Sequence, residues 1–186
     1  MSESRKSNKL LTADEAISSL ETFILGKTSQ EVRLETRRHN RKIAAHMAGQ
    51  GRKILRIFTR ELDPSIYDQK EFVAAAKSLA IYSRFSRIEI LAFESRKIAQ
   101  RGHRLVELAR KLSSSIEVRK PEKRFESHLS AFMTVDAVGY IYRKLDDRFE
   151  GICNYHDPLR VKELDKLFAE IWQYSQVDTE MRRLII

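Results

Sequence analysis

Cysteine is almost absent from this chain of 186 residues, and long apolar runs are missing. The single cysteine, Cys153, cannot form an internal disulfide, and the five histidines show no metal-ligand spacing around it. These facts exclude a disulfide scaffold and a zinc finger. No window approaches the roughly 20 apolar residues of a membrane span, and residues 1–9 lack the apolar core of a signal peptide. We therefore expect a cytoplasmic protein that folds around its own core, with no metal and no cofactor.

Common motifs of nucleotide binding and nucleophilic catalysis are missing as well. The sequence has no Gly-x-Gly-x-x-Gly, no phosphate-binding loop ending in Gly-Lys-Ser/Thr, and no Gly-x-Ser-x-Gly. Gly49-Gln-Gly51 precedes a predicted strand, whereas a nucleotide-binding glycine loop follows one. His156 follows Cys153 by three residues, but neither a helix start nor an orienting acid favours a thiolate. We interpret Cys153 as a small buried hydrophobic residue.

Positive charge is abundant and unevenly placed. There are 35 Lys and Arg residues against 26 Asp and Glu, which gives a net charge of +9. Between Arg33 and Arg60 only one acid, Glu35, accompanies the basic residues Arg33, Arg37, Arg38, Arg41, Lys42, Arg52, Lys53, Arg56 and Arg60. In a helix over residues 31–48, Arg33, Arg37 and Arg41 would form one ridge of mutually repelling charges, which a polyanion would stabilise. A solvated face, or packing against the acidic last third of the chain, would explain the same run, and both interpretations stay open.

Local patterns predict an α/β fold. Thr12 and Glu15 form a capping box that opens a helix reaching Leu25. Further helices are predicted over residues 31–48, 68–80 and 105–112, and one after the N-cap Asp157, in which Trp172 is expected to pack in the core. Strands are predicted over residues 53–59, 87–93, 116–119, 131–135, 139–142 and 150–154. Strands that alternate with helices favour a largely parallel sheet, so we expect a helical extension over residues 1–30 and one α/β domain over residues 31–186.

The order of elements from Ile54 to Ser175 resembles one half of the phospholipase D-like superfamily, which implies a mixed, mostly parallel sheet flanked by helices. Residues 102–105 and 113–119 are also similar to an uncharacterised proteobacterial family. Active superfamily members use a His-x-Lys-x-x-x-x-Asp motif for phosphoryl transfer. Here His128 fits the first position, but Ser130 replaces the lysine, and Asp136 comes one residue late. A shift by one residue turns a strand side chain to the opposite face, so we interpret these three residues as vestiges and expect no catalysis.

The resemblance also implies polar residues that contact phosphate after the degenerate motif. The candidates for such a cleft are Arg143, Arg148 and Asn154, with His103 and Arg104 converging from the preceding helix. The alternative is that residues 143–148 form a charged turn and that His128 is an ordinary hydrogen-bonded histidine, and for each residue taken alone this alternative is favoured.

We expect a non-catalytic module that binds nucleic acid, either structured RNA or a ribonucleoprotein. The predicted contacts are Arg33, Arg37, Arg38, Arg41, Lys42, Arg52 and Lys53. No aromatic residue interleaves with these cations between residues 34 and 55, so contacts to phosphate should dominate. One alternative is a regulatory module that dimerises or docks on a protein through residues 12–25 or the apolar tail Leu184–Ile186. A second is a residual phosphodiesterase formed by a dimer that pairs two His128 sites.

Overall fold

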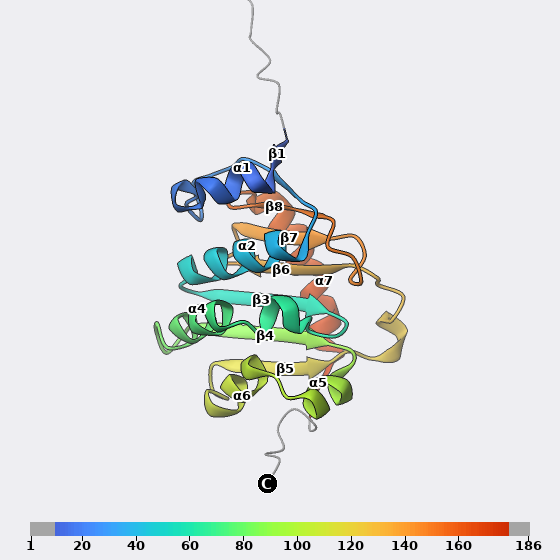
Figure 1. Ribbon diagram of the computed structural model, residues 1–186. Helices are drawn as coiled ribbons and strands as arrows, with labels where there is room; N and C mark the ends of the chain where they lie inside the picture. The colour runs from blue at the N-terminus through green and yellow to red at the C-terminus, as the bar shows by residue number, and fades with distance from the viewer. Residues whose placement is uncertain (1–9, 179–186) are drawn as a thin grey trace, which may run out of the picture.

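The computed structural model describes residues 10–178, apart from the side chains of Ser95, Arg96 and Ala99, so the apolar tail Leu184–Ile186 lies outside the described residues (Figure 1). Within this part, a sheet of nine strands has the order β1-β2-β8-β7-β6-β3-β4-β5-β9. The strands are β1 (Leu11–Thr12), β2 (Val32–Leu34), β3 (Ile54–Thr59), β4 (Arg87–Ala92), β5 (Ile116–Lys120), β6 (Ala131–Val135), β7 (Gly139–Arg143), β8 (Gly151–Asn154) and β9 (Gln176–Val177). Pairing is parallel for β1–β2, β3–β4 and β4–β5.

Helices cover both faces of the sheet. They are α1 (Ala13–Ser18), α2 (Arg37–Gln50), α3 (Pro64–Tyr67), α4 (Lys70–Ala80), α5 (Ser95–Arg101), α6 (Arg104–Lys111) and α7 (Pro158–Gln173). Figure 1 shows α1, α2, α4 and α6 in front of the sheet and α7 behind it. The predicted α/β class, with a mixed sheet flanked by helices, is confirmed. The expectation that the sheet is mostly parallel is wrong, because five of its eight pairings in the described part of the chain are antiparallel. Strands β6, β7 and β8 form a meander that joins β3, β2 pairs with β8, and β9 pairs with β5.

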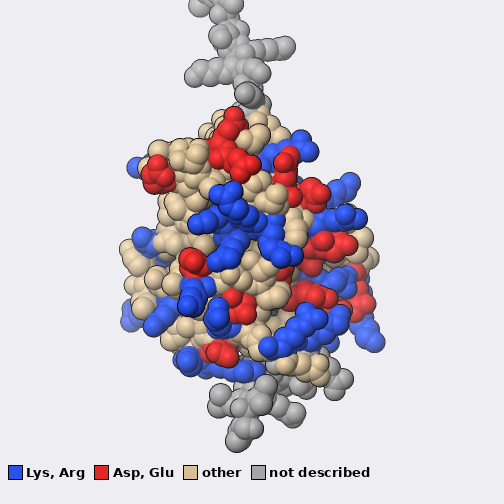
Figure 2. Space-filling view, in the orientation of Figure 1, with Lys and Arg blue, Asp and Glu red and all other residues tan. Residues whose placement is uncertain are grey.

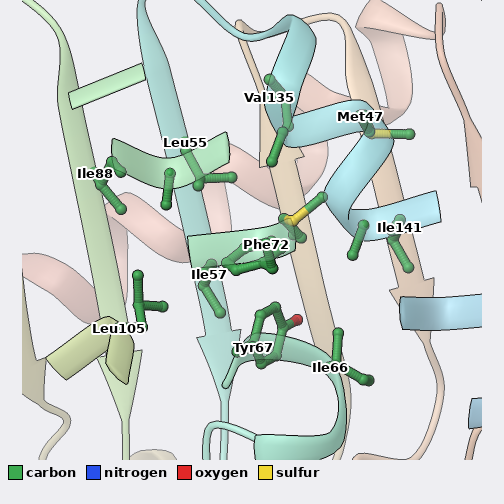
Figure 3. Close-up of a cluster of buried hydrophobic side chains, with 14 of the residues drawn as sticks. Met47, Leu55, Ile57, Ile66, Tyr67, Phe72, Ile88, Leu105, Val135 and Ile141 are labelled. Atoms are coloured by element: carbon green, nitrogen blue, oxygen red, sulfur yellow. The ribbon is translucent and has the colours of Figure 1, made fainter. Parts of the chain in front are cut away.

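Two hydrophobic clusters follow from the alternation of side chains along the strands. On the front face, the strand residues Leu55, Ile57 and Ile141 pack with Met47 of α2 and Phe72 of α4 (Figure 3). On the rear face, a second cluster joins the sheet to α7 through Phe58, Phe132, Tyr140, Val161, Leu164 and Phe168. Trp172 packs against this second cluster, as the sequence predicts.

The predicted helix over residues 31–48 is wrong in its first third. Val32 and Leu34 are buried while Arg33 is exposed, which is the period of a strand, and these residues form β2. Thr36 then caps the helix by accepting a hydrogen bond from the backbone N–H of His39, so α2 starts at Arg37. Since Val32 and Leu34 face the front cluster, Arg33 points to the rear face. The expected ridge of Arg33, Arg37 and Arg41 therefore does not form.

Two of the three predicted helix caps are confirmed. The capping box at Thr12 and Glu15 is present, but α1 ends at Ser18 and a short 3-10 turn follows at Leu20–Thr22. Asp157 caps α7 as predicted. Asp68 does not cap α4, because its carboxylate accepts a hydrogen bond from the backbone of Arg104 instead.

Candidate nucleic-acid interface

The first two turns of α2 expose a group of cations, which we call the α2 basic cluster: Arg37, Arg38, Arg41 and Lys42. These side chains face solvent because the opposite side of α2, including Ile43 and Met47, packs on the sheet. Figure 2 shows Lys and Arg side chains gathered over α2. The first turn of α2 contains no acidic residue. A helix N-terminus carries partial positive charge, so cations in this position are electrostatically unfavourable for the isolated helix.

Only part of this charge is compensated within the described residues. Arg38 lies 3.5 Å from a carboxylate oxygen of Asp14, and Arg41 lies 3.3 Å from one of Glu71. All four of these side chains are exposed, and exposed ion pairs contribute about 0 to 1 kcal/mol. Phosphate groups can therefore replace these acids at small cost.

The other two cations of the cluster form no ion pair within the described residues, although the charge of Lys42 adds to a backbone hydrogen bond and to Arg41 in lowering the pKa of Glu71. The Arg37 guanidinium lies over the Phe149 ring, 5.3 Å from its centroid. Lys42 makes no hydrogen bond or ion pair with any residue that the structure describes. Both charges thus remain open to an anionic ligand.

The remaining predicted contacts lie elsewhere. Arg33 pairs with Glu35 at 3.3 Å on the rear side of β2. Arg52 and Lys53 follow the C-terminal end of α2, and a helix of 14 residues is about 21 Å long. The structure thus brings Arg37, Arg38, Arg41 and Lys42 together and separates them from Arg33 and from the Arg52–Lys53 pair.

The three vestigial residues of the degenerate motif do not share a site. His128 and Ser130 precede β6, whereas Asp136 follows it, and a strand of 5 residues spans roughly 17 Å. His128 packs near the Phe58 and Phe125 rings, with centroid distances of 6.5 and 6.3 Å. The Asp136 carboxylate accepts hydrogen bonds from the backbone N–H groups of residues 52, 53 and 54 at 2.7 to 2.9 Å. It therefore fixes the entry to β3.

A cleft of about 500 Å³ opens beside the degenerate motif, where β3 and β7 end. It is lined by Arg60, Glu61, Asp63, Pro64, Leu129, Leu145, Asp146 and Asp147. The four carboxylates outnumber the single guanidinium, and that group is engaged, because Arg60 donates to the carbonyl of Glu126 at 2.8 Å. Asp146 accepts hydrogen bonds from the Thr59 hydroxyl and the Arg60 backbone. Glu61 is paired with Lys97 and Arg101, and Asp146 lies 3.8 Å from Arg143, so these two acids are partly compensated. The lining itself still presents more acid than base to a phosphodiester anion.

Arg143, one of the predicted phosphate contacts, holds its own loop in place. It is 2% exposed, and its Nη1 donates to the backbone carbonyls of Asp146 and Arg148 at 3.1 and 3.0 Å. Arg148 itself is exposed in the loop that Arg143 holds. Asn154 pairs with Tyr140 at the start of β7, whereas Arg143 ends that strand, so the two lie at opposite ends of β7.

His103 and Arg104 mark the start of α6. His103 Nδ1 accepts from the Leu105 backbone at 3.2 Å, and Nε2 lies 3.1 Å from the Leu62 carbonyl oxygen, to which it donates. Burial lowers the pKa of His103, which favours this neutral form. Arg104 donates to the Asp68 carboxylate and carbonyl. The five predicted phosphate contacts therefore do not converge on one cleft.

Other candidate chemistry is sparse in the described part. Cys153 is completely buried, and burial raises the pKa of its thiol, so the residue is an apolar packing group. Among residues 10–178 there is no group of three His, Cys, Asp or Glu side chains arranged to hold a metal ion. No helix in this part has both the length and the apolar character needed to cross a membrane.

Sequence reasoning missed an exposed aromatic loop. The connection from α4 to β4 exposes Ile81, Tyr82 and Phe85, which are 60%, 60% and 71% accessible. The sequence does contain a signal for this loop: three large apolar residues lie between a helix end and a strand, interspersed with Arg84 and Arg87. This signal is weak in the sequence because the residues lie about 30 positions after Arg52 and Lys53, with which they associate.

The proposed docking surface at residues 12–25 is largely used inside the molecule. Ala13, Ala16 and Phe23 are buried, and the Phe23 ring meets that of Tyr155 edge to face at 5.4 Å. Ile24 remains 45% exposed.

Comparisons with known proteins identify the fold and the family. TrmBL2, an archaeal chromatin protein whose structure shows a novel mode of DNA binding, is similar with a TM-score of 0.61 and 12% identity, over 89% of this chain and 59% of its own. NucT from Helicobacter pylori gives 0.60 and 10%, over 80% of this chain and 98% of its own. Nuc from Salmonella typhimurium, a phospholipase D family member, gives 0.51 and 15%, over 73% and 88%.

The chain thus spans about three fifths of the length of TrmBL2 and nearly all of NucT. At these identities the likeness shows a phospholipase D-like fold. No curated protein matches significantly. A family model described as Domain of unknown function (DUF7931) matches residues 36–184, which is most of the chain, and the chain therefore belongs to the DUF7931 family.

Proposed function

We propose that this protein is a non-catalytic phospholipase D-like module that binds nucleic acid, in the form of structured RNA or a ribonucleoprotein. The observation that carries the proposal is the α2 basic cluster, four exposed cations in the first two turns of α2, of which Arg37 and Arg38 lie in the first turn, where the helix dipole disfavours positive charge. Two of the four form no ion pair in the described residues. Neutralising phosphates with these cations releases condensed counterions, which favours binding.

Two further observations support a binding role without phosphoryl transfer. Ser130 stands where active relatives place a lysine, and the neighbouring cleft is lined by four carboxylates. Phosphoryl transfer requires positive charge around the transferred group, which this lining does not supply. The similarity of fold to TrmBL2 supports nucleic acid as the ligand, since the structure of that protein shows DNA binding.

The test removes charge without reversing it. We expect Arg37→Gln/Lys42→Gln to weaken binding of a labelled RNA hairpin about tenfold at roughly 50 mM salt, measured by fluorescence anisotropy. The slope of log K against log salt should become shallower by about two, because two phosphate contacts are lost.

A matched double variant on the rear helix provides the control. Lys162→Gln/Lys166→Gln removes the same charge from exposed positions of α7 and should leave the affinity within about twofold. Equal weakening by both pairs would show that net charge alone acts. Absence of wild-type binding to hairpin RNA, ribosomal RNA and duplex DNA near 50 mM salt would overturn the proposal.

A further inference from the structure

The exposed aromatic loop lies at the edge of the sheet where β3 and β4 begin. No described aromatic residue is more exposed than Phe85, and Tyr82 lies three positions before it. Because β3 and β4 are parallel, their starts meet at one edge, and the register pairs Ile54 with Arg87. The loop therefore lies against Arg52 and Lys53, which precede β3.

Hydrogen bonds hold this loop in a defined position. The Ser86 hydroxyl donates to the Arg52 carbonyl at 2.8 Å, and the Arg87 backbone N–H donates to the Lys53 carbonyl at 2.9 Å. Within the loop, the Phe85 backbone donates to the Ser83 hydroxyl at 3.2 Å. The exposed rings are therefore mounted on a fixed backbone, which lowers the entropy cost of binding.

The rings are interleaved with cations. The Arg52 guanidinium lies 5.0 Å from the Tyr82 ring centroid, and that of Arg84 lies 4.6 Å from the Phe85 centroid. Arg87 and Lys53 add two further exposed charges. Figure 2 shows Lys and Arg side chains along this edge, at the left of the view.

Acidic groups do not compensate this charge within the described residues. None of Arg52, Lys53, Arg84 and Arg87 forms an ion pair there. Asp136 faces the same edge, where its carboxylate accepts three backbone hydrogen bonds, so one acid stands against four cations. The edge therefore remains cationic, in contrast to the acidic cleft at the opposite ends of the strands.

Exposed aromatic rings between uncompensated cations fit unpaired nucleotides. Base faces are accessible for stacking only where bases are not enclosed in a duplex, while the cations neutralise the backbone. We propose that this edge binds single-stranded nucleic acid, with unpaired bases stacked on Tyr82 and Phe85 and phosphates neutralised by Arg52, Lys53, Arg84 and Arg87. The proposal rests on the nucleic-acid function proposed above and specifies the part of the ligand that this edge recognises.

The experiment compares two probes of the same sequence: an RNA strand of about 12 nucleotides without self-complementarity, and its blunt-ended duplex. The double variant Tyr82→Ala/Phe85→Ala should weaken binding of the single strand by about tenfold for each ring lost, because stacking is removed. Its affinity for the duplex should change less than twofold, since the cations remain. Both side chains are exposed, and an unchanged thermal unfolding midpoint confirms that the fold is intact.

Two controls separate stacking from apolarity and charge. Ile81→Ala removes an equally exposed apolar side chain of the same loop and should leave both affinities unchanged. Tyr82→Phe/Phe85→Tyr keeps both rings and should bind the single strand as the wild type does.

The outcomes distinguish the two proposals. Unchanged single-strand binding in the alanine double variant, or equal weakening for single strand and duplex, overturns the stacking edge while leaving the α2 basic cluster standing. If the wild-type protein binds hairpin or ribosomal RNA but not the single strand near 50 mM salt, the stacking edge alone fails; if it binds none of these nucleic acids, the nucleic-acid function fails, and the stacking edge fails with it.

Discussion

At the scale of single residues, Asp136, which comes one residue after the acid position of the motif, has a structural role. Its backbone has a φ of 52°, and its carboxylate accepts three backbone hydrogen bonds from residues more than 80 positions earlier. We expect Asp136→Ala to lower the free energy of unfolding by about 2 to 3 kcal/mol, because hydrogen bonds to a charged group are lost. Urea denaturation with tryptophan fluorescence measures this change.

An exposed aspartate elsewhere in the molecule supplies the control for Asp136. Asp147 is exposed in the loop after β7, so Asp147→Ala should change the free energy of unfolding by less than about 0.5 kcal/mol. If both alanine variants behave alike, the clamp at Asp136 contributes nothing measurable to stability.

Single residues with local partners could be predicted from the sequence, and those with distant partners could not. Thr12 and Asp157 bond to residues three positions away, so their capping roles are visible in the sequence. Arg143 was predicted as a phosphate contact, but it is buried among backbone carbonyls of its own loop. The loop geometry that orients this guanidinium is not encoded in residue type or spacing.

At the scale of secondary-structure elements, one polar network fastens α7 to the rear of the sheet. Arg56 of β3 donates to Glu89 of β4 at 2.9 Å and to Asp165 of α7 at 2.7 Å. The Thr134 hydroxyl of β6 donates to the other Asp165 oxygen at 2.7 Å. The Arg56 side chain is 23% exposed and lies over the Phe168 ring.

We expect Arg56→Met to lower the free energy of unfolding by about 2 to 4 kcal/mol, because two partly buried carboxylates lose their counter-charge. Adding Glu89→Gln and Asp165→Asn should recover a large part of this loss, since the uncompensated charges are then absent. Chemical denaturation of the single and triple variants measures both effects. A triple variant less stable than Arg56→Met would show that the loss comes from packing on Phe168.

Helices and strands could be predicted from the sequence where their pattern of apolar residues extends over several residues. Strands β3 to β8 and helices α4, α6 and α7 lie close to the predicted positions, because their apolar patterns cover several residues. Strand β2 has 3 residues next to a helix, which is too short for its period to stand out. The edge strands β1 and β9 have 2 residues each and exist through their pairing with β2 and β5.

At the scale of the whole molecule, the net charge of +9 is not a property of one surface. The basic run of residues 33–60 is distributed over the rear of β2, the start of α2, the start of β3 and the polar network under α7. Composition predicted an anionic partner, but the sheet topology decides which cations act together. The pairing of Arg52 with the ring of Tyr82 arises only when β3 and β4 lie side by side.

The sequence predicts residues 1–30 as a separate extension, and the contacts of this segment with the rest of the fold bear on that prediction. In the structure, β1 pairs with β2, and the side chain of Gln50 in α2 bonds to the backbone of Phe23 and Leu25 at 2.9 Å each. Deleting residues 1–30 would leave β2 as an unpaired edge and uncover the buried contact of Phe23 with Tyr155.

We expect this deletion to lower the unfolding midpoint by roughly 10 °C, measured by circular dichroism, because more than about 3 kcal/mol of packing and hydrogen bonding is lost. Ile24→Ser is the control, since it changes a residue of the same segment that is 45% exposed and should leave the midpoint nearly unchanged. A truncated chain that unfolds at the temperature of the full chain would show that residues 31–186 fold independently. In that case, the contacts of β1 and Phe23 would attach an appendage to the domain without contributing to its stability.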